Sequence, residues 1–128
     1  MINAIHIALS GLQAASRRVE ASASNIANMQ TPDYNPLTTT QTAQADETGQ
    51  GTGVSARNIP KSNGFTPSYD PDSPFANEQG LVNTPAVDLA EEAVNMSMAE
   101  TAYKASVAVI KTTEDMTDEM LKAFDRKV

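Results

Sequence analysis

The sequence predicts a mainly α chain whose long N- and C-terminal helices pack as an antiparallel, coiled-coil-like pair. Helical apolar periodicity runs through residues 2–28 and again through residues 88–127. All seven prolines and five of the six glycines lie between these two segments. Because prolines and glycines break helices, the middle should be rich in loops and hold a small β element. A chain built in this way favours packing against neighbours over enclosing an active site.

The chain divides into three segments that we expect to form a single structural unit. Residues 1–28 should form an N-terminal axial helix and residues 87–128 a C-terminal axial helix. Residues 29–86 form the Pro/Gly-rich middle with its short strands. With 128 residues, the chain is one small domain at most.

The N-terminal helix is predicted from a seam whose members are spaced alternately three and four residues apart. These members are Ile2, Ile5, Leu9, Leu12, Ser16, Val19, Ala23 and Ile26. A seam of this kind faces a partner helix, and the small residues Ser16 and Ala23 predict close approach. We expect Leu9 and Leu12 to be buried against the C-terminal helix or a neighbouring subunit. The helix should end near Asn28, because Pro32 cannot continue it.

The segment 31–34 is predicted to turn the chain outward from the helix. Pro32 forbids helix continuation, Asp33 tolerates left-handed geometry, and Tyr34 offers an apolar ring with a polar tip. A generic loop that merely follows a helix is the alternative. Both interpretations place a break between Thr31 and Tyr34.

The remainder of the middle is predicted to be part polar loop and part strand. Residues 38–53 are polar and would be disordered on their own. Short strands are expected at 54–59, 65–69 and 81–83, with residues 60–64 as a hairpin connection.

The C-terminal helix should begin at Asp88, an N-cap residue with Glu91 three positions later. Its apolar residues fall into two adjacent stripes, which together are broader than a two-helix seam needs. The first holds Leu89, Ala93, Met96, Tyr103, Val107, Ile110, Leu121 and Phe124; the second holds Val94, Met98, Ala102, Ala105, Val109, Met116 and Met120. We expect contact with more than one helix, and an ordinary helical hairpin is the alternative.

Composition excludes most kinds of chemistry. A net charge of -7 argues against a nucleic-acid surface, and the absence of cysteine excludes disulfides and thiol catalysis. His6 is the only histidine and cannot anchor a transition-metal site alone. Asp70, Asp72 and Glu78 lack the spacing of a calcium loop, and no glycine pattern suits a phosphate. We therefore expect no enzymatic activity, no cofactor, no metal and no small-molecule substrate.

The N-terminus predicts neither a cleavable secretory signal nor a membrane span. It lacks a basic leading region, and its apolar residues are periodic instead of continuous. If the protein leaves the cytoplasm, we expect a route that reads no cleaved signal.

The residues that end the first helix resemble a family signature. Residues 24–34 read SNIANMQTPDY, which is similar to the SxNxANxxTPGY signature of flagellar rod and hook proteins. Residues 92–96 (EAVNM), 102–106 (AYKAS) and 109–116 (VIKTTEDM) resemble the C-terminal blocks of the same family. Asp33 stands where that family usually has glycine.

The middle resembles the proximal rod members of this family. Residues 69–74 read YDPDSP and residues 78–85 read EQGLVNTP, which are similar to the YDPxHP and GYVxxPN blocks. Ala86 and Asp88 replace asparagines, and Glu100-Thr101 stands where small and basic residues are usual. The resemblance covers nearly the whole chain.

This resemblance implies a structural subunit of the bacterial flagellar basal-body rod, in its proximal part. Such a subunit passes through the flagellar type III export apparatus without a cleaved signal and polymerises into the periplasmic drive shaft. Its partners would be copies of itself and other rod proteins. The competing hypothesis is a soluble helical adaptor or export chaperone that binds a partner helix. The subunit-packing residues that we expect are Ile5, Leu9, Leu12, Val19, Ile26, Asn28, Thr31, Pro32, Tyr34, Val94, Met98, Tyr103, Val107 and Ile110.

Overall fold

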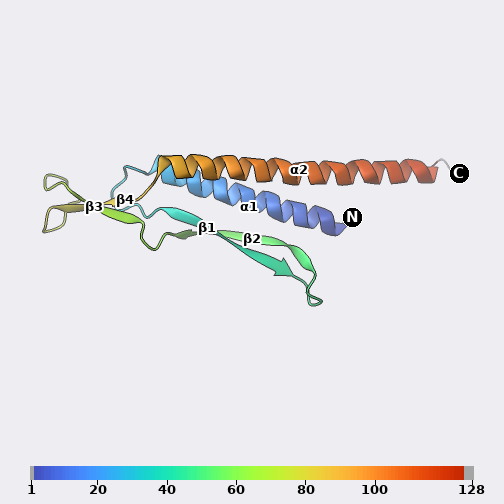
Figure 1. Ribbon diagram of the computed structural model, residues 1–128, viewed down its shortest axis with the longest axis horizontal. Coiled ribbons are helices and arrows are strands. Elements are labelled where there is room, and N and C mark those ends of the chain that lie inside the picture. Colours follow the sequence, from blue (N-terminus) through green and yellow to red (C-terminus); the bar gives the residue numbers. More distant parts are fainter. Residues whose placement is uncertain (1, 126–128) are drawn as a thin grey trace.

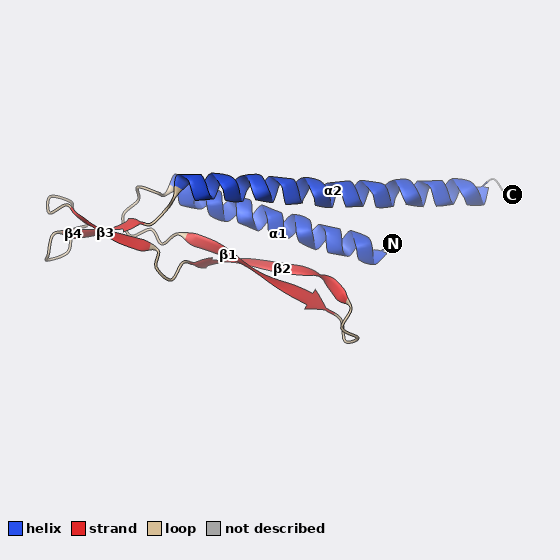
Figure 2. Cartoon of the chain, viewed as in Figure 1, coloured by secondary structure: helices blue, strands red, loops and turns tan. Residues whose placement is uncertain are grey.

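The computed structural model describes residues 2–125 and contains two long helices and two small sheets (Figures 1 and 2). In chain order the elements are α1 (Ile2–Ala27), β1 (Leu37–Ala45), β2 (Gly51–Pro60), β3 (Phe65–Tyr69), β4 (Leu81–Pro85) and α2 (Leu89–Asp125). Helix takes 50% of the chain and strand 24%, so the expectation of a mainly α chain is wrong. The β content was underestimated because the polar residues before position 54 carry little apolar alternation.

The two helices run antiparallel along one another, and the described ends of the chain lie at the same end of the molecule (Figure 1). Asn25 near the end of α1 lies opposite Glu92 near the start of α2, and Gly11 lies opposite Ser106. Helix α1 has 26 residues and α2 has 37. The last turns of α2 therefore project beyond α1.

Small residues form the contact between the helices. Ala8 and Ala15 of α1 and Ala99 of α2 are buried, and a Cβ atom on Gly11 would lie 2.9 Å from the Ser106 Oγ. Small side chains allow two helix axes to approach closely, and large ones hold them apart. We call the line through Ala8, Gly11, Ala15, Ser22 and Asn25 the small-residue seam.

The predicted apolar seam lies outside the closest contact with α2, so of its two expected partners, the C-terminal helix and a neighbouring subunit, α2 does not cover it. Ile5 is 37% exposed and Leu9 is 43% exposed, while Leu12 is half-buried. Close approach to α2 occurs at Ala8, Gly11 and Ala15 and not at Ser16 and Ala23, which are half-buried and exposed. The large aliphatic side chains lie beside the closest contact, on the outer surface of α1.

Strands β1 and β2 form an antiparallel hairpin that lies along α1 (Figure 1). Its register runs from Leu37 opposite Pro60 to Ala45 opposite Gly51, so much of the polar stretch 38–53 is ordered as strand. The Asp46 carboxylate closes the turn by accepting hydrogen bonds from the Thr48 hydroxyl and the Gln50 amide, at 2.6 and 2.9 Å. The four threonines in β1 suit a pleated surface.

Strands β3 and β4 form a second antiparallel hairpin, with Phe65 opposite Pro85 and Tyr69 opposite Leu81. The three strands predicted from the sequence fall within β2, β3 and β4. Residues 60–64 do not connect a hairpin, because β2 pairs with β1 and β3 pairs with β4. A turn-rich sequence marks a change of direction, but the pairing partner depends on contacts made elsewhere.

Candidate assembly surface

Asn25 is the centre of the junction where α1, α2 and the β1–β2 hairpin meet. It is 0% exposed, and both the Nδ2 and the Oδ1 of its side chain are hydrogen-bonded. Its Nδ2 donates to the Leu37 carbonyl at 2.9 Å and to the Glu92 Oε1 at 2.7 Å. Its Oδ1 accepts from the Leu37 amide at 2.7 Å and from the Tyr34 hydroxyl at 3.2 Å. One side chain therefore fixes four segments of the chain relative to one another.

Glu92 is a charged side chain buried at this junction, where it is 2% exposed. Besides the bond from Asn25, its carboxylate lies 3.8 Å from the Lys61 ammonium group, which also lies 3.7 Å from Glu91. Lys61 itself is held by its backbone amide, which donates to the Pro36 carbonyl at 2.8 Å. A buried carboxylate needs such partners because desolvation penalises an isolated charge. These contacts give Glu92 a structural role.

The segment 31–34 breaks the chain after α1, as both interpretations of the sequence predict, and the chain then returns alongside Asn25 at Leu37. Asp33 has φ of 59°, which confirms its left-handed geometry. Its amide donates to the Asn83 carbonyl at 3.0 Å, and its Oδ1 accepts from the Asn83 amide group at 3.1 Å. The Tyr34 hydroxyl lies 2.7 Å from the Ser24 Oγ. The turn therefore joins the end of α1 to β4.

The structure places the predicted subunit-packing residues in two regions. Asn28, Thr31, Pro32 and Tyr34 belong to the junction, where Thr31 donates from its hydroxyl to the Asn28 Oδ1 at 3.2 Å. The others lie on helix surfaces. Ile5, Leu9, Val94, Met98 and Tyr103 are exposed, and Leu12, Val19, Ile26, Val107 and Ile110 are half-buried.

An apolar groove of about 790 Å³ runs between the two helices on the face that carries part of this set. Val19 lines it from α1, and Met96 and Tyr103 line it from α2. Glu20 and Glu100 also line the groove, and each is paired with a basic residue on its own helix. Lys104, which donates to Glu100, holds the pKa of that carboxyl below its usual value. The groove is therefore an apolar surface bordered by neutralised charges.

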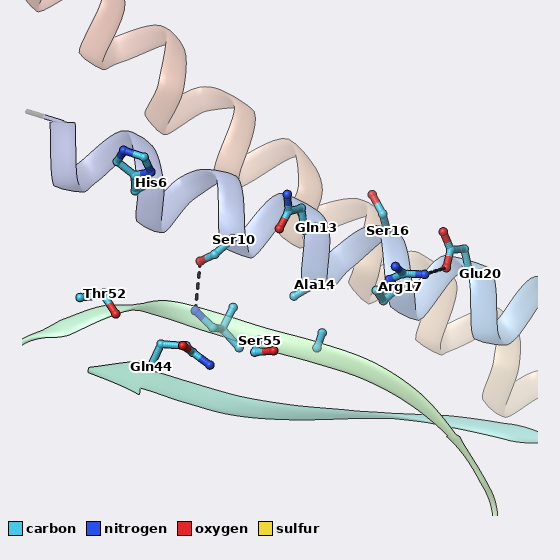
Figure 3. A pocket seen from close by; sticks show the side chains of 12 residues that line it. His6, Ser10, Gln13, Ala14, Ser16, Arg17, Glu20, Gln44, Thr52 and Ser55 are labelled. Atoms are coloured by element: carbon cyan, nitrogen blue, oxygen red, sulfur yellow. Dashed lines mark hydrogen bonds and ion pairs between the residues drawn. The ribbon is translucent and has the colours of Figure 1, made fainter. Parts of the chain in front are cut away.

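A second, polar groove of about 670 Å³ lies between α1 and the β1–β2 hairpin (Figure 3). The Ser10 Oγ accepts a hydrogen bond of 3.0 Å from the Val54 amide, which fixes the hairpin to the helix. His6 and Glu20 line the same groove but lie about 21 Å apart along the helix, and Glu20 pairs with Arg17 at 2.9 Å. These side chains do not form a nucleophile–base set.

The described residues contain neither a metal site nor a membrane span. Within residues 2–125, no group of three His, Cys, Asp or Glu side chains could hold a metal ion. Over the same residues, neither helix combines the length and the apolar character needed to cross a membrane.

Sequence reasoning missed Asn25, Glu92 and the small-residue seam as determinants of the fold. Asn25 and Glu92 both lie within the blocks that resemble the flagellar family. The seam was also detectable, because residues 8, 11, 15, 22 and 25 fit a three-and-four spacing that is interrupted only at Arg18. The line of large aliphatic residues was predicted as the helix contact because its periodicity is the stronger signal, whereas α2 packs on the small-residue seam.

Two family models match parts of this chain. The one described as flagella basal body rod protein matches residues 5–34, which include most of α1 and the turn. The one described as flagellar basal body rod FlgEFG protein C-terminal matches residues 78–123, which include β4 and most of α2. The matches thus cover both helices and the junction between them.

Relatives are similar over nearly their whole length. The chain is 35% identical to the flagellar basal-body rod protein FlgC of Salmonella typhimurium, over 97% of this chain and 96% of the relative. It is 33% identical to FlgC of Escherichia coli O157:H7 over the same shares, and 28% identical to FlgC of Aquifex aeolicus over 97% of both chains. With the helix pair and its signature turn in place, the chain belongs to the family of flagellar basal-body rod proteins, and it is a structural protein of that rod, not an enzyme.

Proposed function

We propose that this chain is a proximal-rod subunit that polymerises, with copies of itself and with other rod proteins, into the axial drive shaft of the flagellum. The observation that carries the proposal is the placement of the large apolar side chains. The small-residue seam forms the closest contact between α1 and α2, and residues such as Leu9 and Met98 remain on the surface. They are available to neighbouring subunits.

The energetics support assembly through these surfaces. Burial of one such side chain stabilises a contact by about 1.5–3 kcal/mol, so a few of them per neighbour suffice to drive association. Within the described chain the buried apolar residues, apart from two prolines, are five alanines and Val82, and alanines contribute far less. Neighbours in the rod would supply the missing burial.

The small buried apolar area of the single chain also favours export in an unfolded form before assembly. The chain passes through the flagellar export apparatus unfolded and folds as it joins the periplasmic rod. Helices with so little buried apolar area are marginal alone, which favours an unfolded form in transit. Residues 1–28, 29–86 and 87–128 then act as one structural unit, joined at Asn25.

The proposal can be tested by introducing a single charged residue on the outer surface of α1. Leu9→Asp should leave expression unchanged and abolish swimming and incorporation into basal bodies, because the new carboxylate would be buried at a subunit contact. Leu12→Asp should behave in the same way. Swimming and immunoblots of purified basal bodies from a strain that lacks the native gene give the measurement.

The matched control is Ala108→Asp, on the solvent-exposed face of α2. It adds the same charge to a helix surface and should allow normal swimming. Wild-type swimming of the Leu9→Asp and Leu12→Asp variants would refute packing through the outer surface of α1.

Hydrogen exchange separates this proposal from a self-contained adaptor. A rod subunit should show little amide protection in residues 2–28 and 100–125 when purified as a monomer, since its helices need neighbours. Strong protection in both segments at monomeric concentration would favour the adaptor.

A further inference from the structure

We infer that the free end of α2 docks on the outer surface of α1 in a second copy of this chain. Two surfaces define the contact. The overhang is residues 114–125 of α2, and the outer stripe of α1 is Ile5, Leu9, Leu12, Ser16 and Val19. The inference rests on the proposed polymerisation and specifies one contact within it.

The overhang has an uncovered apolar face. Thr113 is buried, whereas every residue from 114 to 125 is exposed, and this part of α2 extends beyond α1 (Figure 1). Leu121 is 59% exposed and Phe124 is 70% exposed, with Met116 and Met120 about half exposed. Twelve helical residues span about 18 Å, which is long enough for three turns of contact with another helix.

Charge favours the outer stripe of α1 as the partner of this face. Residues 114–125 hold five acidic residues and one basic residue, Lys122. Helix α1 has no acidic residue before Glu20, and its first turns carry the positive end of the helix dipole. Two overhangs would repel each other, whereas an overhang and an outer stripe attract.

The contact must join different copies. Gly11 lies opposite Ser106, so Leu9 is level with about residue 108 of its own α2. Leu121 lies 13 residues further along, or about 20 Å away, and a straight helix cannot return to the outer stripe of its own chain. Because the two surfaces differ and occupy separate places, each copy can bind one neighbour through each surface. Such a heterologous contact extends into an open array instead of closing into a dimer.

Disulfide cross-linking tests this contact directly, because the chain contains no cysteine. The variants are Leu9→Cys, Leu121→Cys and the double variant, each expressed in cells that lack the native gene and then treated with a mild oxidant. Co-expression of the two single variants should give a cross-linked dimer. The double variant should give a ladder of multimers, and each single variant alone should remain monomeric. Leu9→Cys combined with Ala90→Cys, at the opposite end of α2, is the control and should give no ladder.

A charge variant provides a second measurement. Asp118→Lys in the Leu9→Cys/Leu121→Cys background should lose the ladder, and Asp118→Asn should retain most of it, because the first reverses the attraction. Dimers from either single variant alone would overturn the inference, since they require like surfaces to meet. The inference would also be overturned if double-variant cells swim and carry the chain in their basal bodies but give no ladder. That result would leave the proposed polymerisation intact. Absence of the wild-type chain from basal bodies would instead contradict the proposed function.

Discussion

Asn25 donates a hydrogen bond of 2.7 Å from its Nδ2 to the Oε1 of Glu92. The two residues are 67 positions apart in the sequence, and their bond joins α1 to α2. Both side chains are almost completely buried, and the same amide also holds Leu37 at the start of β1. Asn25 therefore links α1, α2 and the first hairpin directly at their junction. A buried polar group that is fully satisfied specifies an arrangement, because any other arrangement would leave it unpaired.

Asn25→Asp should strongly reduce incorporation into the rod. It removes the donor to Leu37 and Glu92 and places a second carboxylate beside a buried one. An unsatisfied buried group costs about 1–3 kcal/mol, and repulsion between the carboxylates adds to this cost. The measurement is the content of the chain in basal bodies from cells grown at increasing temperature. Asn63→Asp, in the exposed β2–β3 connection, is the matched control and should be near neutral; equal behaviour of the two variants would contradict the role of Asn25.

Gly11 should tolerate alanine with little net effect and larger residues not at all. A Cβ atom there lies 2.9 Å from the Ser106 Oγ, which donates to the Ala102 carbonyl at 3.0 Å. Alanine gains about 1 kcal/mol in helix propensity but displaces that hydroxyl, so the two effects nearly cancel. Gly11→Leu should abolish swimming by forcing the helices apart. Gly11→Ala with Ser106→Ala should swim at least as well as the native chain, and a defect in this pair would show that the clash lies elsewhere.

Asp33 should accept glycine and reject valine. Its φ of 59° costs a non-glycine residue about 1–2 kcal/mol, most for a β-branched side chain. Asp33→Gly relieves this strain but loses the bond to Asn83, so swimming should change little. Asp33→Val should reduce basal-body content, measured by immunoblot, whereas the same level for both variants would argue against a fixed left-handed turn.

The hydroxyl and the ring of Tyr34 should contribute separately to the stability of the turn and so to incorporation into the rod. Tyr34→Phe removes the bonds to Ser24 and Asn25 and should cost about 1 kcal/mol, while Tyr34→Ala also empties the space of the ring and should cost more. Incorporation into the rod should therefore fall in the order native, Phe, Ala, with Pro32→Ala milder than Tyr34→Ala. Normal assembly of all three variants would mean that the turn merely follows the helix.

The β1–β2 turn should loosen in acid. Hydrogen bonds from the Thr48 side chain and the Gln50 amide hold the pKa of Asp46 below its ordinary value of 3.8. A carboxyl with a depressed folded-state pKa contributes stability above its unfolded pKa, and this contribution is lost as the pH falls through the folded value. NMR titration of the Asp46 carboxyl and the Thr48 amide should therefore show a midpoint below 3.8. Asp46→Ala should remove the transition at the Thr48 amide, and a midpoint at or above the ordinary value would contradict the turn.

The sequence by itself determined the features that depend on neighbouring residues. Pro32 and the residues before it set the end of α1, and Asp88 caps α2 by accepting hydrogen bonds from the Ala90 and Glu91 amides at 2.8 and 3.4 Å. Asp33 takes the left-handed turn because few residues other than glycine tolerate it better. The family could be recognised for the same reason, since its signature lies in continuous blocks.

Only the tertiary structure decided which surfaces meet. Three of the four strands could be placed from the sequence, but the pairing of β1 with β2 depends on a turn held by Asp46 and on the Ser10 hydroxyl across the chain. The face of α1 that contacts α2 was misjudged because large aliphatic residues give the stronger periodic signal. Close packing of two helices favours the smallest side chains, so Gly11 and its neighbours took the interior and Leu9 remained outside. The burial of Asn25 follows from that close approach, because the tertiary structure selects the small-residue line over the parallel line of larger aliphatic residues.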